Sequence, residues 1–173
     1  MSPPIFGVVG WKNSGKTTLM ANLIRELTHR GLSVSVIKHA HAKFEIDHPG
    51  RDSFKMREAG ARQVLLSSFR RFALMRELGD TPEMRFEELL PYASSCDLVL
   101  VEGYKREAYP KIEIRREGAV SREPLSANCP QVVAIVSDRP DNEQDQLPVF
   151  HVDAIGPIVD FIVATLGLSA HDT

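Results

Sequence analysis

Short apolar runs and amphipathic stretches follow one another along the chain. The apolar run at residues 5–9 ends at Gly10 and predicts a buried strand. Apolar residues then recur at helical spacing over residues 17–30, and Gly31 supplies a stop signal. Residues 33–38 alternate and then become apolar, which indicates a second strand. This order predicts two parallel strands joined by a right-handed crossover through a helix.

The rest of the chain continues the alternation of elements. Residues 39–51 are polar, have no clear period and predict a loop. Further helices are expected at residues 52–59, 83–90 and 155–168, and further strands at residues 64–66, 72–75, 98–101, 111–115 and 131–137. No internal repeat or flexible linker interrupts this order. The sequence therefore predicts a single α/β domain over residues 1–173, with a mostly parallel twisted sheet flanked by helices.

Composition narrows the classes of partner. The chain has 173 residues, 43% of them hydrophobic and 25% charged, with a formal net charge of -2. Such a balance produces no global field toward nucleic acid or an anionic membrane, so neither is an expected partner. Cys96 and Cys129 are far apart and form no C-x-x-C pair, which argues against a disulfide framework or a thiolate zinc site. We expect a cytoplasmic protein.

Residues 10–17, Gly-Trp-Lys-Asn-Ser-Gly-Lys-Thr, match the pattern G-x-x-x-x-G-K-[ST] between the first strand and the first helix. In this motif the glycines let backbone N–H groups turn toward phosphate oxygens, and the positive end of the helix favours the same anion. Lys16 is expected to reach the β- and γ-phosphates, and the Thr17 hydroxyl to ligate Mg²⁺. The sequence therefore predicts a P-loop NTPase fold that binds a nucleotide with Mg²⁺.

A P-loop needs a second acid near the metal, at the end of a neighbouring strand. Two carboxylates, Asp97 and Glu102, flank the apolar residues 98–101. Ligands of open α/β sheets bind at the carboxyl ends of the strands, where Glu102 lies, whereas Asp97 lies at the opposite end. Glu102 is the expected Mg²⁺ acid, acting through water, and the alternative is a carboxylate that only caps the strand.

The polar loop at residues 39–51 and its boundary supply further candidates. Asp47 and Asp52 are expected to contact Mg²⁺ or to position an attacking water, because this region of P-loop proteins approaches the γ-phosphate. Asp52 has an alternative as the N-cap of the next helix. The loop also contains three histidines, His39, His41 and His48, but a His-x-His pair without cysteine or a fixed fourth ligand indicates a transition-metal site only weakly.

A basic cluster lies midway along the chain and comprises Arg57, Arg62, Arg70 and Arg71. It is compatible with an anionic ligand or with a solvated surface, and the sequence favours neither.

One residue is a candidate for recognising the base of the nucleotide. Asp138 follows the predicted strand at residues 131–137, and its carboxylate there accepts hydrogen bonds from guanine N1–H and N2–H₂, which adenine does not offer. The alternative is an aspartate in the turn before Arg139 and Pro140. The complete guanine motif N-K-x-D is absent from the sequence.

These segments together resemble the MobB-type molybdopterin-guanine dinucleotide biosynthesis adaptor proteins. The resemblance covers nearly the whole chain and rests on the P-loop and on residues 36–41, 47–53, 57–61, 101–105, 110–113 and 137–138. One departure is Trp11-Lys12-Asn13, where small residues are more usual.

The resemblance implies a homodimeric GTP-binding protein with weak GTPase activity that acts beside the guanylyltransferase joining GMP to molybdopterin. Carried over by position, it implies phosphate binding by Gly10, Asn13, Ser14, Gly15, Lys16, Thr17 and Thr18. It also implies Mg²⁺ binding by Thr17 and Glu102, and guanine binding by Asp138.

Two other functions use the same P-loop. A small-molecule kinase would need an acceptor pocket with a positioned base, and no base pairs clearly with Arg70 and Arg71 as a cationic lid. A metallochaperone GTPase would need a metal-ligand set that the histidines do not clearly provide.

Overall fold

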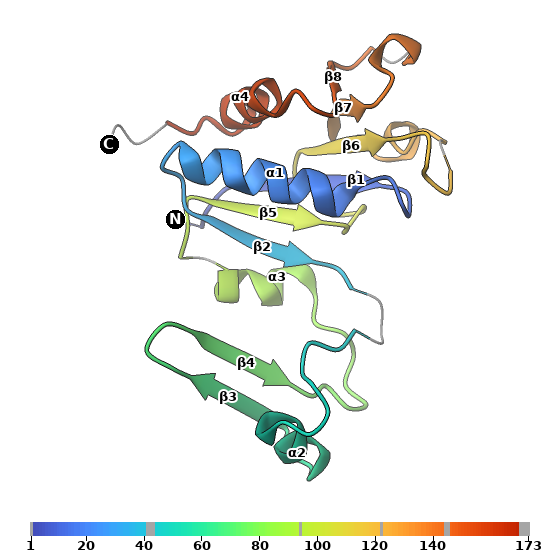
Figure 1. Cartoon of the computed structure of the whole chain (residues 1–173). Helices are drawn as coiled ribbons and strands as arrows, with labels where there is room; N and C mark the ends of the chain where they lie inside the picture. Colours follow the sequence, from blue (N-terminus) through green and yellow to red (C-terminus); the bar gives the residue numbers. More distant parts are fainter. Residues whose placement is uncertain (1, 41–43, 94, 122, 144–145, 170–173) are drawn as a thin grey trace. The chain divides into compact units, whose positions relative to one another are not determined.

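The computed structural model describes residues 2–40, 44–93, 95–121, 123–143 and 146–169 (Figure 1). The chain divides into two compact units, one made of Met1–His39 with Phe86–Thr173 and the other of Ala40–Arg85. The units are described separately below. The single domain expected from the sequence stays a prediction.

The first unit contains a six-stranded parallel sheet in the order β2-β5-β1-β6-β7-β8. Its strands are β1 (Ile5–Gly10), β2 (Val34–Lys38), β5 (Leu98–Glu102), β6 (Lys111–Arg115), β7 (Val132–Ser137) and β8 (Val149–His151). β1 lies inside the sheet, hydrogen-bonded to β5 on one side and to β6 on the other. The predicted parallel α/β architecture is confirmed. The sequence did not predict β8, because three residues are too few to show a period of two.

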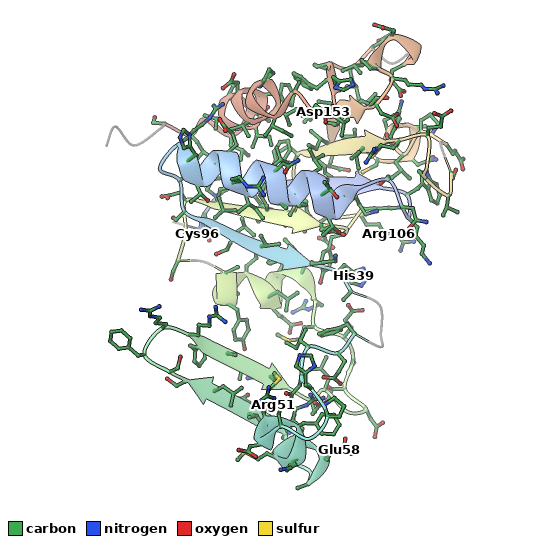
Figure 2. All side chains as sticks on the ribbon, viewed as in Figure 1. His39, Arg51, Glu58, Cys96, Arg106 and Asp153 are labelled. Atoms are coloured by element: carbon green, nitrogen blue, oxygen red, sulfur yellow. The ribbon has the colours of Figure 1, made fainter. Side chains whose placement is uncertain are left out.

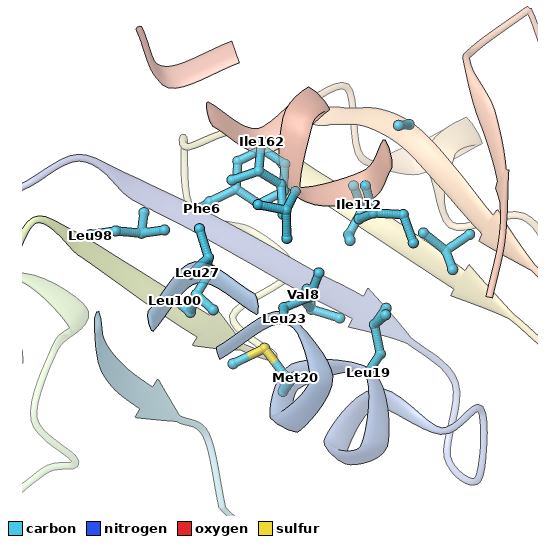
Figure 3. Close-up of a cluster of buried hydrophobic side chains, with 14 of the residues drawn as sticks. Phe6, Val8, Leu19, Met20, Leu23, Leu27, Leu98, Leu100, Ile112 and Ile162 are labelled. Atoms are coloured by element: carbon cyan, nitrogen blue, oxygen red, sulfur yellow. The ribbon is translucent and has the colours of Figure 1, made fainter. Parts of the chain in front are cut away.

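One face of this sheet is covered by two helices, α1 (Lys16–His29) and α4 (Ile155–Leu166). Because side chains alternate across a strand, Phe6 and Val8 of β1 and Leu100 of β5 share this face. Each of these three side chains is fully buried, and they pack with Leu23 of α1 (Figure 3). The apolar face that the sequence predicts for the first helix therefore packs into the main hydrophobic core.

The opposite face is covered near β5 by the short helix α3 (Phe86–Leu89) and the 3-10 turn η1 (Leu90–Ala93). Phe86 packs there with Val99 and Val101, which alternate with the core-facing leucines of β5. The longer helix predicted at residues 83–90 is thus a shorter helix followed by a 3-10 turn. Two further 3-10 turns, η2 (Ser126–Asn128) and η3 (Pro140–Asn142), follow β6 and β7.

Strand β6 carries buried charge on this second face. Glu113 is fully buried, and its carboxylate accepts hydrogen bonds from the backbone N–H groups of Leu125 (2.8 Å) and Ser126 (3.1 Å). Arg115 Nη2 lies 2.8 Å from Glu113 Oε2, and Arg115 Nη1 lies 2.7 Å from Glu143 Oε2. A buried carboxylate is costly unless it is paired and hydrogen-bonded. These contacts tie the chain that follows β6 to the sheet.

The second unit contains helix α2 (Asp52–Glu58) and a two-stranded antiparallel sheet of β3 (Gln63–Ser67) and β4 (Phe72–Arg76). Arg57 of α2 holds three carboxylates, with Nη1 2.9 Å from Glu45 Oε1 and 3.3 Å from Asp47 Oδ2, and Nε 2.6 Å from Glu77 Oε1. Arg57 is therefore neutralised inside its own unit, so it adds no uncompensated charge to the basic cluster predicted from the sequence. Among the described helices of the chain, none is long and apolar enough to cross a membrane.

Candidate functional site

The loop between β1 and α1 has the backbone conformation that a phosphate-binding loop requires. Asn13 and Gly15 have φ values of 65° and 84°, in the left-handed region. Gly15 is also the N-cap of α1, so no side chain caps the N–H groups of the first helical turn. These N–H groups and the positive end of the helix favour an anion at this position.

The loop is packed tightly against β6. A Cβ atom added to Gly10 would lie 2.7 Å from the Ile114 carbonyl oxygen and 2.7 Å from Ser14 Oγ. Ser14 is fully buried, and its hydroxyl has no hydrogen-bond partner among the described residues. The loop thus has a buried hydroxyl that can still donate, and it has no space for a side chain at its first glycine.

Lys16 folds back across this loop. Its ammonium donates to the carbonyl oxygens of Gly10 (3.1 Å) and Trp11 (2.7 Å). Burial lowers the pKa of Lys16; the nearby Glu102 carboxylate opposes this effect, whereas the charges of Lys105 and Lys38 add to it. Three ammonium groups therefore act on the same region, which is the charge that a polyphosphate needs.

Three functional atoms form a triangle beside the loop. The Thr17 hydroxyl donates to Glu102 Oε2 over 3.3 Å, and Lys38 Nζ lies 3.3 Å from Thr17 Oγ1 and 3.3 Å from Glu102 Oε2. The strand register produces this arrangement, because Glu102 pairs with Val8 of β1 and with Lys38 of β2. The sequence analysis gave roles to Thr17 and Glu102 and none to Lys38.

The two oxygens of this triangle suit a divalent cation. Two neighbouring ligands of an octahedral Mg²⁺, each about 2.1 Å from the ion, lie roughly 3 Å apart. The distance between Thr17 Oγ1 and Glu102 Oε2 is 3.3 Å. In the described part of the chain, no group of three or more His, Cys, Asp or Glu side chains is placed to hold a metal. An ion here would complete its shell with phosphate oxygens and water, as Mg²⁺ commonly does.

The unusual residues of the P-loop attach it to its neighbours. Trp11 Nε1 donates to the Glu123 carbonyl oxygen over 2.8 Å, and the Lys12 carbonyl oxygen accepts from Val120 N–H over 2.9 Å. Lys105 Nζ lies 4.4 Å from the centre of the Trp11 ring, within cation–π range. The Trp11 side chain therefore has a structural role, since it fixes the segment after β6 to the loop, whereas Lys12 contributes its backbone carbonyl oxygen.

Asp138 lies where the sequence analysis expected it, directly after β7. Its Oδ2 accepts from Glu117 N–H over 3.1 Å and lies 3.7 Å from Arg116 Nε, whereas its buried Oδ1 has no hydrogen-bond partner among the described residues. Arg116 also covers the P-loop, because a Cβ atom at Gly15 would lie 3.0 Å from its Nη1. The sequence analysis missed Arg116. Its position after the strand at residues 111–115 was the available signal, since carboxyl ends of parallel strands share one edge.

The edge of the sheet that holds the P-loop can be followed in Figure 2. His39 comes directly after β2 and Arg106 follows β5 at this edge, whereas Cys96 precedes β5 at the opposite edge. The His39 ring lies 4.9 Å from the Tyr104 ring. His41, the second member of the His-x-His pair, lies outside the described residues.

The two loop aspartates belong to the second unit. Asp47 Oδ1 accepts from Ser53 Oγ over 2.9 Å, and Asp47 Oδ2 pairs with Arg57. Asp52 is the first residue of α2 and lies 3.6 Å from Lys55 Nζ, and the N-cap position belongs to Arg51. The N-cap alternative for Asp52 is therefore wrong. The expected contact of Asp47 and Asp52 with Mg²⁺ or water stays a prediction.

Comparison with known proteins shows which protein family this chain is similar to. The family model of molybdopterin guanine dinucleotide synthesis protein B matches residues 5–138. A molybdopterin-guanine dinucleotide biosynthesis adapter protein of Escherichia coli (strain K12) is 36% identical over 162 residues, covering 92% of this chain and 91% of the relative. Its counterpart from Haemophilus influenzae is 38% identical over 159 residues, covering 92% and 87%. The crystal structure of Bacillus subtilis MobB, 27% identical, superposes with a TM-score of 0.72 and covers 94% of this chain and 98% of that one.

Gly10→Ala tests the packing of the loop. The added methyl group would meet the Ile114 carbonyl oxygen at 2.7 Å, so the loop or β6 must shift. We expect the free energy of unfolding, measured by urea denaturation, to fall by about 1–3 kcal/mol. Gly118→Ala is the matched control, because a Cβ atom there meets nothing within 4 Å, and its effect should stay within about 0.5 kcal/mol. Equal effects of the two substitutions would contradict the packing argument.

Proposed function

Because this chain belongs to the MobB family, we propose that it is a GTP-binding adapter in molybdopterin-guanine dinucleotide biosynthesis. In this proposal it binds Mg²⁺–GTP, hydrolyses it slowly and assists a cytoplasmic guanylyltransferase that joins GMP to molybdopterin. The observation that carries the proposal is the arrangement of Lys16, Thr17 and Glu102 at the sheet edge where the P-loop turns into α1.

The phosphates would be held by the P-loop backbone, the Ser14 hydroxyl and the Lys16 ammonium. The buried Ser14 hydroxyl supports this assignment, because a phosphate oxygen would give it the acceptor that it has not found among the described residues. Gly10, Asn13 and Gly15 would set the turn of the backbone, and the Thr18 N–H in the first helical turn would add a donor at the positive end of α1.

Mg²⁺ would be held by Thr17 Oγ1 and by Glu102, either directly or through water, with the remaining ligands from phosphate and solvent. When bound, the ion neutralises the negative charge that develops between the β- and γ-phosphates. The residues of this chain then bind and orient the nucleotide: Lys16 faces the same oxygens from the loop, and Glu102, which is 8% exposed, keeps a fixed carboxylate beside them.

Guanine would be recognised by Asp138. Its Oδ1 has an unused acceptor among the described residues, while Oδ2 is held by Glu117 N–H, so the carboxylate is oriented before the base arrives. A guanine edge offers two N–H donors to a carboxylate, and adenine offers no matching pair. An oriented acceptor that is left unpaired by the wrong base is an effective source of discrimination.

The decisive measurement is a calorimetric titration with GTP and ATP analogues in the presence of Mg²⁺. We expect binding with a clear preference for guanine, and Lys16→Ala should weaken GTP binding by about 10- to 100-fold because a charged hydrogen-bond donor is lost. Lys12→Ala is the matched control, since among the described residues Lys12 makes a hydrogen bond only through its backbone carbonyl oxygen. We expect this substitution to weaken GTP binding by less than about 3-fold. Wild-type affinity in Lys16→Ala would overturn the P-loop assignment, and a preference for adenine would favour a small-molecule kinase.

Asp138→Asn tests the guanine assignment. The amide retains one acceptor but places a donor against the donors of guanine, so we expect the ratio of ATP to GTP dissociation constants to fall by about 10-fold or more. Binding of the ATP analogue should change by less than about 2-fold. Asp141→Asn, at an exposed carboxylate in the following turn, should leave the ratio unaltered. An unchanged ratio in Asp138→Asn would mean that another residue selects the base.

We also propose that the protein is a homodimer and that the β3–β4 sheet contributes to its interface. An isolated two-stranded sheet is marginally stable in water, and this one exposes Leu65 (56%) and Phe72 (66%) on one face. A second copy of the chain would bury these side chains.

Sedimentation equilibrium tests the dimer. The double substitution of Leu65→Lys with Phe72→Lys places charge on the apolar face, and we expect the dimer dissociation constant to rise by about 10-fold or more. Thr28→Lys, on the exposed side of α1, should leave it unchanged. A monomeric wild-type protein, or equal effects of the two variants, would contradict this interface.

A further inference from the structure

We propose that the Lys38 ammonium is a built-in competitor of Mg²⁺, which holds Thr17 Oγ1 and Glu102 Oε2 until Mg²⁺–GTP displaces it. This inference rests on the proposed function, because it concerns the same nucleotide site. It adds a residue that sets how strongly nucleotide binding depends on the divalent ion.

The contacts of Lys38 carry the argument. Its Nζ lies 3.3 Å from Thr17 Oγ1 and 3.3 Å from Glu102 Oε2, and these two oxygens lie 3.3 Å from each other. The ammonium therefore contacts both oxygens that are spaced for Mg²⁺. A divalent ion between the same oxygens would lie closer to the ammonium than two cations tolerate without strong repulsion. Binding of one cation excludes binding of the other.

The backbone allows Lys38 to leave while the oxygens stay in place. Lys38 is the last residue of β2, paired with Glu102 of β5, and the next N–H, that of His39, donates to the Glu102 carbonyl oxygen over 3.0 Å. The Glu102 side chain is only 11% exposed, whereas the Lys38 side chain is 50% exposed. A lysine ammonium on a flexible four-carbon stem can move into solvent without a shift of its strand.

The same contacts predict opposite effects for two kinds of binding. Without Mg²⁺, Lys38 neutralises the Glu102 carboxylate, which would otherwise repel the incoming phosphates. With Mg²⁺, the ion takes over this neutralisation, and Lys38 is only an obstacle to its entry. Removal of Lys38 should therefore weaken metal-free nucleotide binding and strengthen the response to Mg²⁺.

The experiment is a fluorescence titration of the full chain with a fluorescent GTP analogue, first in EDTA and then with increasing Mg²⁺. For Lys38→Met we expect the dissociation constant in EDTA to rise by about 5-fold and the half-saturating Mg²⁺ concentration to fall by about 3- to 10-fold. Lys38→Arg, which keeps a cation at this position, should stay closer to the wild type in both measurements.

Lys105→Met is the matched control. The charges of Lys105 and Lys38 both lower the pKa of Lys16, so either substitution removes one charge from the same field. Lys105 packs on the Trp11 ring and not on Thr17 Oγ1 and Glu102 Oε2, the two oxygens that are spaced for Mg²⁺. We expect Lys105→Met to weaken binding by a similar factor with and without Mg²⁺.

The outcomes separate the two proposals. If the wild-type chain binds GTP with Mg²⁺ but Lys38→Met shows the same Mg²⁺ dependence as Lys105→Met, the competition is wrong and the GTP site stands. If the wild-type chain binds no GTP under either condition, the proposed function fails, and this inference fails with it. A selective change in Lys38→Met supports the competition.

Discussion

The register of β1 between β5 and β6 is the constraint on which the site depends. Parallel pairing brings Val8 of β1 opposite Glu102 and Gly10 opposite Ile114, so the strand that leads into the P-loop is fixed on both sides. A shift of one residue would turn Phe6 and Val8 away from the core and move the loop relative to Glu102. The apolar core and the polar site are therefore two results of one alignment.

Charge within the sheet is handled in two different ways. On β6, Glu113 accepts hydrogen bonds from backbone N–H groups and pairs with Arg115. This buried arrangement fixes the segment after β6, which contains Arg116 beside the P-loop. On β5, Glu102 is also buried, but its carboxylate meets a hydroxyl and a half-exposed ammonium. The first carboxylate has partners that cannot leave without disrupting the fold. The second has partners that can be exchanged, which is what a ligand site requires.

The sequence predicted the elements and the chemical groups better than it predicted their mutual geometry. The pattern of apolar residues was sufficient to predict every strand of the six-stranded sheet except β8. The G-x-x-x-x-G-K-[ST] motif was sufficient to predict the P-loop. The triangle of Thr17, Lys38 and Glu102 depends on β5 lying between β1 and β2, an order that the strands' own patterns do not determine. Arg116 was missed for the same reason, because its contact with Gly15 arises only when β6 lies beside β1. Both features depend on the order of the strands in the sheet, which the types of the individual residues do not determine.

The contacts of the aspartates also bear on why hydrolysis would be slow. The N–H groups at the start of α1, proposed to bind phosphate, already have their geometry from the fold of the first unit. Asp47, which the sequence predicts to contact Mg²⁺ or water, has both carboxylate oxygens engaged, by Ser53 and by Arg57. The Asp47 side chain is only 7% exposed, so at least one of these contacts must open before water reaches its remaining acceptor positions. Each contact is a hydrogen bond to a charged group, worth about 1.5–3 kcal/mol. The N–H groups at the start of α1 have no side-chain cap to give up, so the same chain is expected to bind the phosphates of GTP more readily than it hydrolyses them.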